Sequence, residues 1–265
     1  MSRPAPRHRP LPILVVLGAA AALVFVLPFL GLLVRAPWSA LPALLTDDVA
    51  ADALWLSLVT SLAATIAAAV LGLPLAWLLA RADFPGRGLL RGLVLVPLVL
   101  PPVVGGTALL FALGRRGVVG GPLEDATGIV LPFSTVGVVI AATFVSMPFL
   151  VITVEAALRN LDGRHEGAAE TLGGSPWTVL RRVTLPMIRP SLVAGLALTW
   201  ARALGEFGAT ITFAGNLQGR TQTLPLAVFV ALEQDRDAAI AMSLVMIAVA
   251  LAVIVALRRR WWQEL

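Results

Sequence analysis

The feature that most constrains this chain is a series of long apolar runs with almost no charge in them. Such runs occupy residues 11–34, 53–80, 92–113, 135–154, 190–213 and 238–257. A helix of about 20 apolar residues crosses the hydrocarbon core of a bilayer, so each run is long enough. Only 13% of the residues are charged, against about 25% in an ordinary soluble domain. We therefore predict an all-α integral membrane protein whose six transmembrane helices form one domain over residues 1–265.

The arginines predict the orientation of these helices. All 20 basic residues are arginine, and fourteen of them lie before the first run, between the second and third, between the fourth and fifth, or after the sixth. Five lie in the alternate loops, and Arg202 lies inside a run. Cytoplasmic loops of membrane proteins carry an excess of basic residues. Both termini and the long polar stretch at residues 155–189 are therefore expected in the cytoplasm.

Several chemistries are excluded by residue types that the chain lacks or nearly lacks. Without lysine the chain cannot build the Gly-Lys-Ser/Thr step of a phosphate-binding loop, so it is not expected to hydrolyse ATP or to be an enzyme. It has no cysteine, and His8 and His165 are its only imidazoles, so no metal site and no cofactor of its own are expected. Because the arginines lie in short loops rather than along one surface, the positive charge does not indicate a nucleic-acid partner.

The stretch between the fourth and fifth runs has the pattern of two short helices. Glu166 to Leu172 suits a first helix, and Gly173 with Gly174 would end it. Ser175 and Pro176 then supply an N-cap and a first-turn proline for a second helix. The exposed alanines of such a hairpin would let a partner's groove approach the backbone closely. A solvated loop that lies on the lipid headgroups is the alternative.

This stretch also resembles a known family. Ala168-Ala169, three residues, Gly173, nine residues and then Val183-Thr184-Leu185-Pro186 is similar to the EAA signature of membrane subunits of bacterial binding-protein-dependent ABC importers. The resemblance implies a type I permease fold and a coupling helix that docks on a separate cytoplasmic ATPase subunit. Gly167 stands where the family usually has its glutamate, and Glu166 precedes it by one position. The residues implied in ATPase coupling are Glu166, Gly167, Ala168, Ala169, Leu172, Gly173, Leu185 and Pro186.

Further segments narrow the resemblance to molybdate-transport permeases and, less closely, to their sulfate relatives. These segments are Gly72 to Ala76, Pro97 to Val104, Gly205 to Asn216 and Gly219 to Leu226. The resemblance implies import of molybdate or tungstate across the bacterial cytoplasmic (inner) membrane. It implies three protein partners: an ATP-binding cassette subunit that holds ATP and Mg, an extracytoplasmic oxyanion-binding protein, and a second permease copy in a homodimer. Sulfate or thiosulfate import is the nearest alternative.

Two rival classes remain open at this stage. A self-sufficient secondary transporter would need intramembrane acids or broken helices in paired repeats, and Glu206 is the one acid inside a run. A structural scaffold would use residues 155–189 to recruit an unrelated protein.

Two of the runs contain residues that an ordinary apolar helix avoids. Arg202 and Glu206 are spaced to pair on one helix face, where they would either line a pathway or hold two helices together. The third run contains Pro97, Pro101 and Pro102, which predict a kinked helix that borders the pathway or improves packing. The candidate pathway or gate residues are Pro101, Pro102, Thr107, Arg202, Glu206 and Thr210.

Overall fold

The computed structural model describes residues 11–45 and 47–261, and over these residues the chain is helical without strands. Arg3, Arg7 and Arg9, which entered the prediction of orientation, lie outside the described residues. The helices, in chain order, are α1 (Pro12–Arg35), α2 (Leu41–Leu45), α3 (Asp48–Arg81), α4 (Arg87–Val99), α5 (Pro102–Leu113), α6 (Gly120–Thr127), α7 (Thr135–Asn160), α8 (Arg164–Thr171), α9 (Pro176–Val179), the π-helical turn η1 (Leu180–Thr184), α10 (Leu185–Met187), α11 (Arg189–Leu204), α12 (Gly208–Phe213), α13 (Leu224–Gln234) and α14 (Arg236–Trp261).

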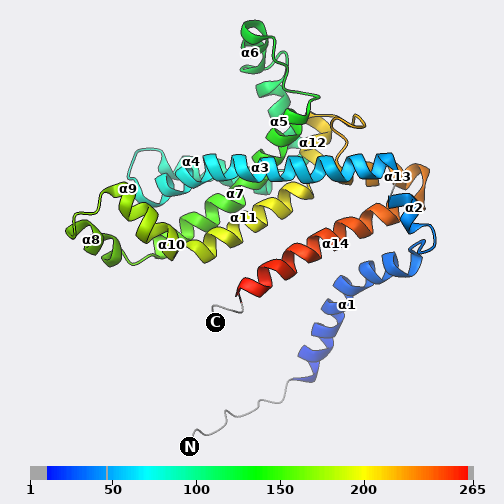
Figure 1. Ribbon diagram of the computed structural model, residues 1–265, viewed down its shortest axis with the longest axis horizontal. Coiled ribbons are helices and arrows are strands. Elements are labelled where there is room, and N and C mark those ends of the chain that lie inside the picture. The colour runs from blue at the N-terminus through cyan, green and yellow to red at the C-terminus, as the bar shows by residue number, and fades with distance from the viewer. Residues whose placement is uncertain (1–10, 46, 262–265) are drawn as a thin grey trace, which may run out of the picture.

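The core of the molecule lies where α3, α7 and α11 pack side by side (Figure 1). Small residues bring these helices together, because close approach of backbones is how helices gain packing energy in lipid. A Cβ added at Gly72 of α3 would lie 3.2 Å from the Met147 side chain of α7. One added at Gly195 of α11 would lie 3.1 Å from the Leu150 side chain. Gly72 and Gly195 therefore set the spacing of α3 and α11 against α7.

Four of the described helices are long and apolar enough to cross a membrane: α1, α3, α7 and residues 236–253 of α14. A fifth is obtained if the segments Pro176–Met187 and Arg189–Leu204, which meet at 74°, count as one span. The third and fifth predicted runs are each divided between two shorter helices. The described helices therefore do not give six uninterrupted spans.

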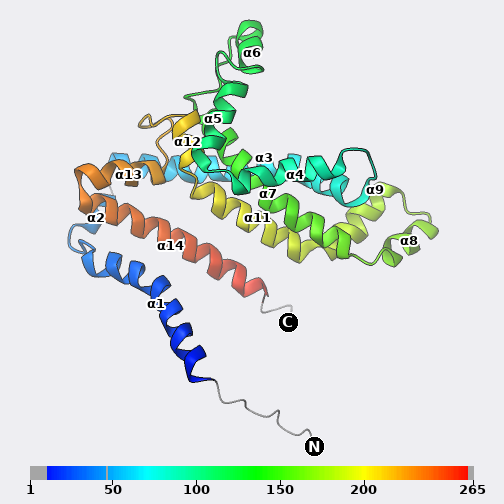
Figure 2. The ribbon, with the colours of Figure 1, turned by 180° about the vertical axis from the view of Figure 1, so that it is seen from behind.

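The third run is broken at Leu100 and Pro101, where α4 ends and α5 begins. Leu100 and Pro101 both take extended backbone angles, because a residue before proline disfavours the helical region. Beyond the break, α5 and α6 leave the layer of α3, α7 and α11 and project away from it, as both ribbon views show (Figures 1 and 2). The predicted kink is therefore a complete break that redirects the chain.

The fifth run is also broken, which corrects the expectation of a continuous helix over residues 190–213. Helix α11 ends at Leu204 with Gly205 as its C-cap, and α12 starts only at Gly208. Glycine loses more conformational freedom in a helix than other residues do, and two glycines flank this break. Arg202 therefore lies in the last turn of α11, while Glu206 lies in the break itself.

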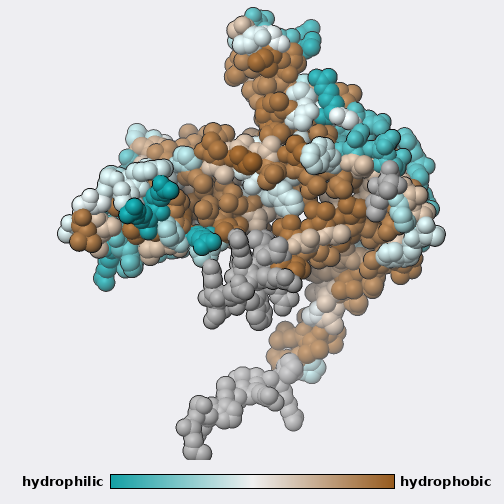
Figure 3. All heavy atoms as spheres, in the orientation of Figure 1, coloured by the Kyte–Doolittle hydropathy of each residue, from teal (hydrophilic) through white to brown (hydrophobic). Residues whose placement is uncertain are grey.

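The surface separates apolar from polar residues along the length of the bundle. Apolar side chains cover the middle of the visible face and most of the α5 projection, while polar residues gather at the end with α8 and α9 and at the opposite end (Figure 3). Helix α1 has no buried residue. An apolar belt between two polar ends is the surface expected of a protein embedded in a bilayer.

Candidate functional site

The polar hairpin formed by α8, α9 and η1 lies at one end of the bundle, beyond the end of α3 (Figure 1). Helix α8 ends as predicted at the two glycines: Gly173 has a φ of 85°, and the Gly174 amide donates to the Ala169 carbonyl at 3.0 Å. A positive φ at this position favours glycine. The Ser175 hydroxyl then accepts a hydrogen bond from the Thr178 amide and caps α9, with Pro176 in its first turn. The two-helix pattern is confirmed.

The tip of this hairpin exposes apolar and small residues. Leu172 is 89% exposed and Trp177 is 68% exposed. Added Cβ atoms at Gly167 and Gly173 would meet nothing within 4 Å, and Ala168 is also exposed. An apolar surface with small residues, presented beyond the membrane-spanning helices, is suited to contact with a protein groove.

The other predicted coupling residues lie elsewhere on the hairpin. Ala169 is half-buried, and its carbonyl is used by the helix cap. Leu185 packs against the core cluster of α3 and α7, while Pro186 is an exposed residue of α10. The sequence motif therefore contains both an exposed tip and an anchor in the bundle, rather than one continuous contact surface.

The carboxylate of Glu166 is bound by two other residues of the same chain. Its Oε2 lies 2.7 Å from the Arg81 guanidinium at the end of α3, and its Oε1 accepts a 2.6 Å hydrogen bond from the Thr184 hydroxyl in η1. Its side chain is only 19% exposed. Glu170, four residues further along, is exposed. Sequence reasoning did not find the contact with Arg81, which joins residues 85 positions apart.

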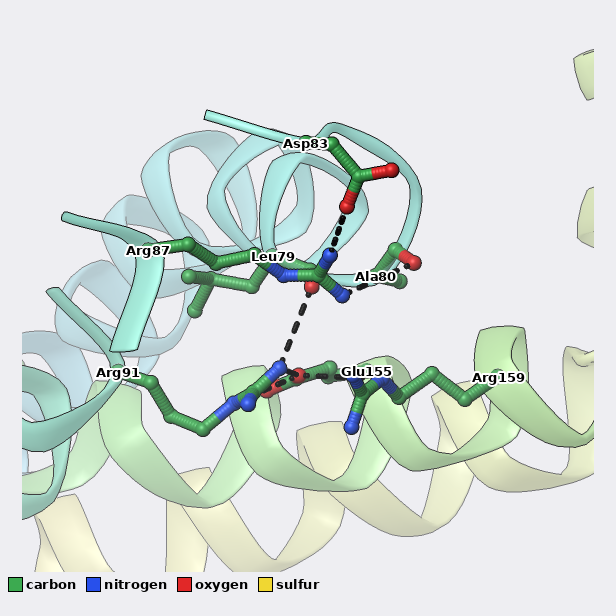
Figure 4. Close-up of polar contacts among 7 residues, drawn as sticks. All are labelled: Leu79, Ala80, Asp83, Arg87, Arg91, Glu155 and Arg159. Atoms are coloured by element: carbon green, nitrogen blue, oxygen red, sulfur yellow. Dashed lines mark hydrogen bonds and ion pairs between the residues drawn. The ribbon is translucent and has the colours of Figure 1, made fainter. Parts of the chain in front are cut away.

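A second charged cluster ties the ends of α3, α4 and α7 together (Figure 4). Arg91 of α4 donates through Nε to Glu155 at 2.9 Å and through Nη2 to the Leu79 carbonyl at 3.4 Å. One turn earlier, Arg87 pairs with Asp83 at 2.7 Å. Arg81, Arg87 and Arg91, which all lie between the second and third apolar runs, thus each have a carboxylate partner.

Glu155 is the residue of this cluster that sequence reasoning missed. Its side chain is only 8% exposed, and Arg159 lies one turn further along α7 with Nε 3.7 Å from its carboxylate. The i, i+4 spacing of Glu155 and Arg159 at the end of an apolar run was the available signal.

The two breaks in the spanning helices lie against each other, because α12 packs closely on α5. A Cβ added at Gly208 would lie 2.6 Å from Cβ of Pro102. One added at Gly106 would lie 2.7 Å from the Ala209 carbonyl oxygen. Both distances are too short for a real side chain. The structure thus brings Pro102 into contact with the start of α12, although Pro101 and Pro102 are both exposed at the break of the third run.

Arg202 and Glu206 form the predicted ion pair, with 2.6 Å between Nη1 and Oε2. The Glu206 side chain is 2% exposed and that of Arg202 is 27% exposed. The other Glu206 oxygen accepts a 2.7 Å hydrogen bond from the Ala209 amide and so caps the start of α12. The pair therefore connects the end of α11 to α12 across the break.

The two candidate threonines differ in their surroundings. Thr107 donates to the Val103 carbonyl of its own helix at 2.9 Å, as hydroxyls in membrane helices commonly do. Thr210 is 1% exposed, and its hydroxyl has no hydrogen-bond partner among the described residues.

Comparison with known proteins identifies relatives over most of the chain. Residues 68–261 match the family model described as binding-protein-dependent transport system inner membrane component. The molybdenum transport system permease protein ModB of Mycobacterium tuberculosis is 50% identical, over 86% of this chain and 87% of its own length. The sulfate transport system permease protein CysT of Escherichia coli is 37% identical, over 80% of this chain and 77% of its own.

A solved structure shares the fold. A chain of a bacterial alginate ABC transporter, solved in complex with an alginate pentasaccharide-bound periplasmic protein, aligns with a TM-score of 0.75 at 17% identity. The alignment covers 92% of this chain and 91% of that chain. The all-helical architecture is therefore a fold found in ABC transporters.

Proposed function

We propose a function from one premise: the chain belongs to the family of inner membrane components of binding-protein-dependent transport systems. It is the permease subunit of an ATP-driven importer that carries molybdate, or the similar tungstate anion, into the cytoplasm. The observation that carries this assignment is the 50% identity with a molybdenum transport permease over 86% of the chain. Sulfate import is the second candidate function, because the sulfate permease is 37% identical to this chain and the molybdenum permease is 50% identical.

The chain itself does not hydrolyse ATP in this proposal. The separate ATPase subunit binds ATP and Mg, and its groove receives the tip of the α8–α9 hairpin. The exposed Leu172 and Trp177 supply the apolar contact, and Gly167, Ala168 and Gly173 let the groove approach the backbone. Because Glu166 is paired within the chain, the acid presented to the ATPase is Glu170.

The remaining partners follow from the same family. Two permease copies form the translocation unit, and an extracytoplasmic binding protein delivers the oxyanion to the end of the bundle opposite α8. Both termini and the α8–α9 hairpin lie in the cytoplasm of a bacterium, in agreement with the excess of arginines on that side. Arg202, with about a quarter of its side chain exposed beside the two helix breaks, is the basic residue best placed to border the anion's path.

Uptake by the complete complex tests the proposal. Permease, ATPase and binding protein are reconstituted in vesicles, and uptake of labelled molybdate is measured with and without ATP, in competition with tungstate, sulfate and thiosulfate. We expect ATP-dependent uptake that tungstate inhibits and sulfate does not. Gradient-driven uptake by the permease alone would support a secondary transporter instead. Failure of the permease to bind the ATPase, together with no uptake, would support a scaffold.

A further inference from the structure

The contact between Arg81 and Glu166 joins the hairpin that faces the proposed ATPase to the longest helix of the bundle. Arg81 is the last residue of α3, which has 34 residues and packs along α7 and α11. Glu166 lies in the first turn of α8. The main packing partners of α8 are α9 and η1, which belong to the same hairpin. The ion pair is thus a direct connection from α8 to a membrane-spanning helix.

The surroundings of this pair indicate that the ion pair, and not densely packed side chains, links α8 to α3. A cavity of about 210 Å³ lies beside it, and Arg81, Glu166 and Thr184 are among the residues that line it. A packed apolar contact would resist displacement through many atoms, whereas here two charged side chains span the space between α3 and α8. Arg81 is 28% exposed and Glu166 is 19% exposed, so water screens the pair only in part.

Both carboxylate oxygens of Glu166 are used, and they connect different elements. Oε2 holds Arg81 of α3, and Oε1 holds Thr184, which is 2% exposed in η1. Residue 184 is followed by α10 and α11. A displacement of α8 would therefore act on α3 through Arg81 and on the chain that leads to α11 through Thr184.

We propose that Glu166 and Arg81 are a positioning pair that transmits the displacement of α8 to α3, so that ATP hydrolysis is coupled to transport. This inference rests on the proposed function, because it requires an ATPase to move α8. Neither residue touches the cargo. Loss of the pair uncouples transport from hydrolysis while the ATPase stays bound, since the exposed tip at Leu172 and Trp177 is unchanged.

The test measures uptake of molybdate per ATP hydrolysed by the reconstituted complex, together with the amount of ATPase bound. Arg81→Ala and Glu166→Ala are each expected to lower uptake per ATP at least fivefold, with ATPase binding unchanged. The double variant is expected to be no worse than either single variant, because the two residues act as one unit. Arg81→Lys, which retains the positive charge, is expected to recover most of the uptake.

The matched control is Asp83→Asn, which removes the neighbouring pair between Arg87 and the 97% exposed Asp83 without touching α8. It is expected to leave uptake per ATP unchanged.

The inference would be overturned if Arg81→Ala and Glu166→Ala both kept uptake per ATP within twofold of the unmodified complex. It would also be overturned if the losses in the two single variants added up in the double variant. In either case the proposed function would stand. If Arg81→Ala or Glu166→Ala does not assemble, Glu166→Gln decides, because it removes the charge of the pair and keeps the size of the side chain. Uptake per ATP within twofold of the unmodified complex also overturns the inference, and a larger loss supports it. Absence of uptake and of ATPase binding in the unmodified complex would instead refute the proposed function.

Discussion

Arg202 and Glu206 hold α11 and α12 together across a break in the chain, with 2.6 Å between the charged groups and Glu206 almost fully buried. Removal of Arg202 alone would leave a buried carboxylate without its counter-ion. We expect Arg202→Ala to lower the free energy of unfolding by about 3 kcal/mol or less, the lower end for a buried pair, because Arg202 is partly exposed. Thermal unfolding of the purified protein in detergent measures this.

The double variant Arg202→Ala/Glu206→Gln separates the loss of charge balance from the loss of the helix cap. Glutamine is neutral, and its carbonyl can still accept the hydrogen bond from the Ala209 amide. The double variant should therefore unfold at a higher temperature than Arg202→Ala. Equal or lower stability of the double variant would mean that the two side chains do not depend on each other.

The close packing of α5 on α12 predicts that alanine destabilises the protein at Gly106 but not at Gly92, a glycine with free space around it. Gly106→Ala places a Cβ 2.7 Å from the Ala209 carbonyl oxygen, so a backbone must move. We expect a loss of about 1–3 kcal/mol, as for other overpacked sites. Gly92→Ala in α4 meets nothing within 4 Å and should stabilise that helix by roughly 0.5–1 kcal/mol. Chemical denaturation of both variants measures the difference, and equal effects would contradict the close packing of α5 on α12.

The sequence predicted the features that depend on local chemistry. The two-helix hairpin followed from Gly173, Gly174, Ser175 and Pro176, because caps and first-turn prolines act within a few residues. The pairing of Arg202 with Glu206 followed from their spacing. The break at Leu100 and Pro101 was visible as a kink, but the new direction of α5 depends on its packing against α12.

The remainder depends on contacts between segments far apart in the chain. The partner of Glu166 is 85 residues away, and that of Arg91 is 64 residues away. No periodicity in a single sequence indicates which arginine a carboxylate will meet after folding. For the same reason, the exposed tip of the hairpin and the anchored Leu185 could not be told apart within one motif.

The hairpin tip predicts how Gly173 tolerates replacement. Its φ of 85° is one that leucine adopts at a cost of about 1–2 kcal/mol, whereas asparagine accepts it more readily. We expect Gly173→Leu to abolish uptake and ATPase binding while membrane insertion is retained, and Gly173→Asn to retain more of both activities. Ala169→Leu, in the half-buried part of α8, should also abolish transport. Co-purification of the ATPase with each variant measures binding, and normal transport by Gly173→Leu would count against the proposed docking surface.

The cluster around Glu155 predicts a stability effect that is separate from coupling. Arg91→Ala removes the contacts from α4 to both Glu155 and the Leu79 carbonyl, and leaves a carboxylate that is 8% exposed with only Arg159 at 3.7 Å. We expect a loss of about 3 kcal/mol or less, because Arg159 still offsets part of the charge. The stability of Arg91→Lys should lie between that of the unmodified protein and that of Arg91→Ala, since an ammonium group cannot reproduce the fork of a guanidinium.

Asp83→Asn is again the control, because the pair of Asp83 with Arg87 is exposed and such pairs contribute little to stability. Thermal unfolding of the three variants in one detergent tests the order, and a loss in Asp83→Asn as large as in Arg91→Ala would show that burial of Glu155 does not set the effect.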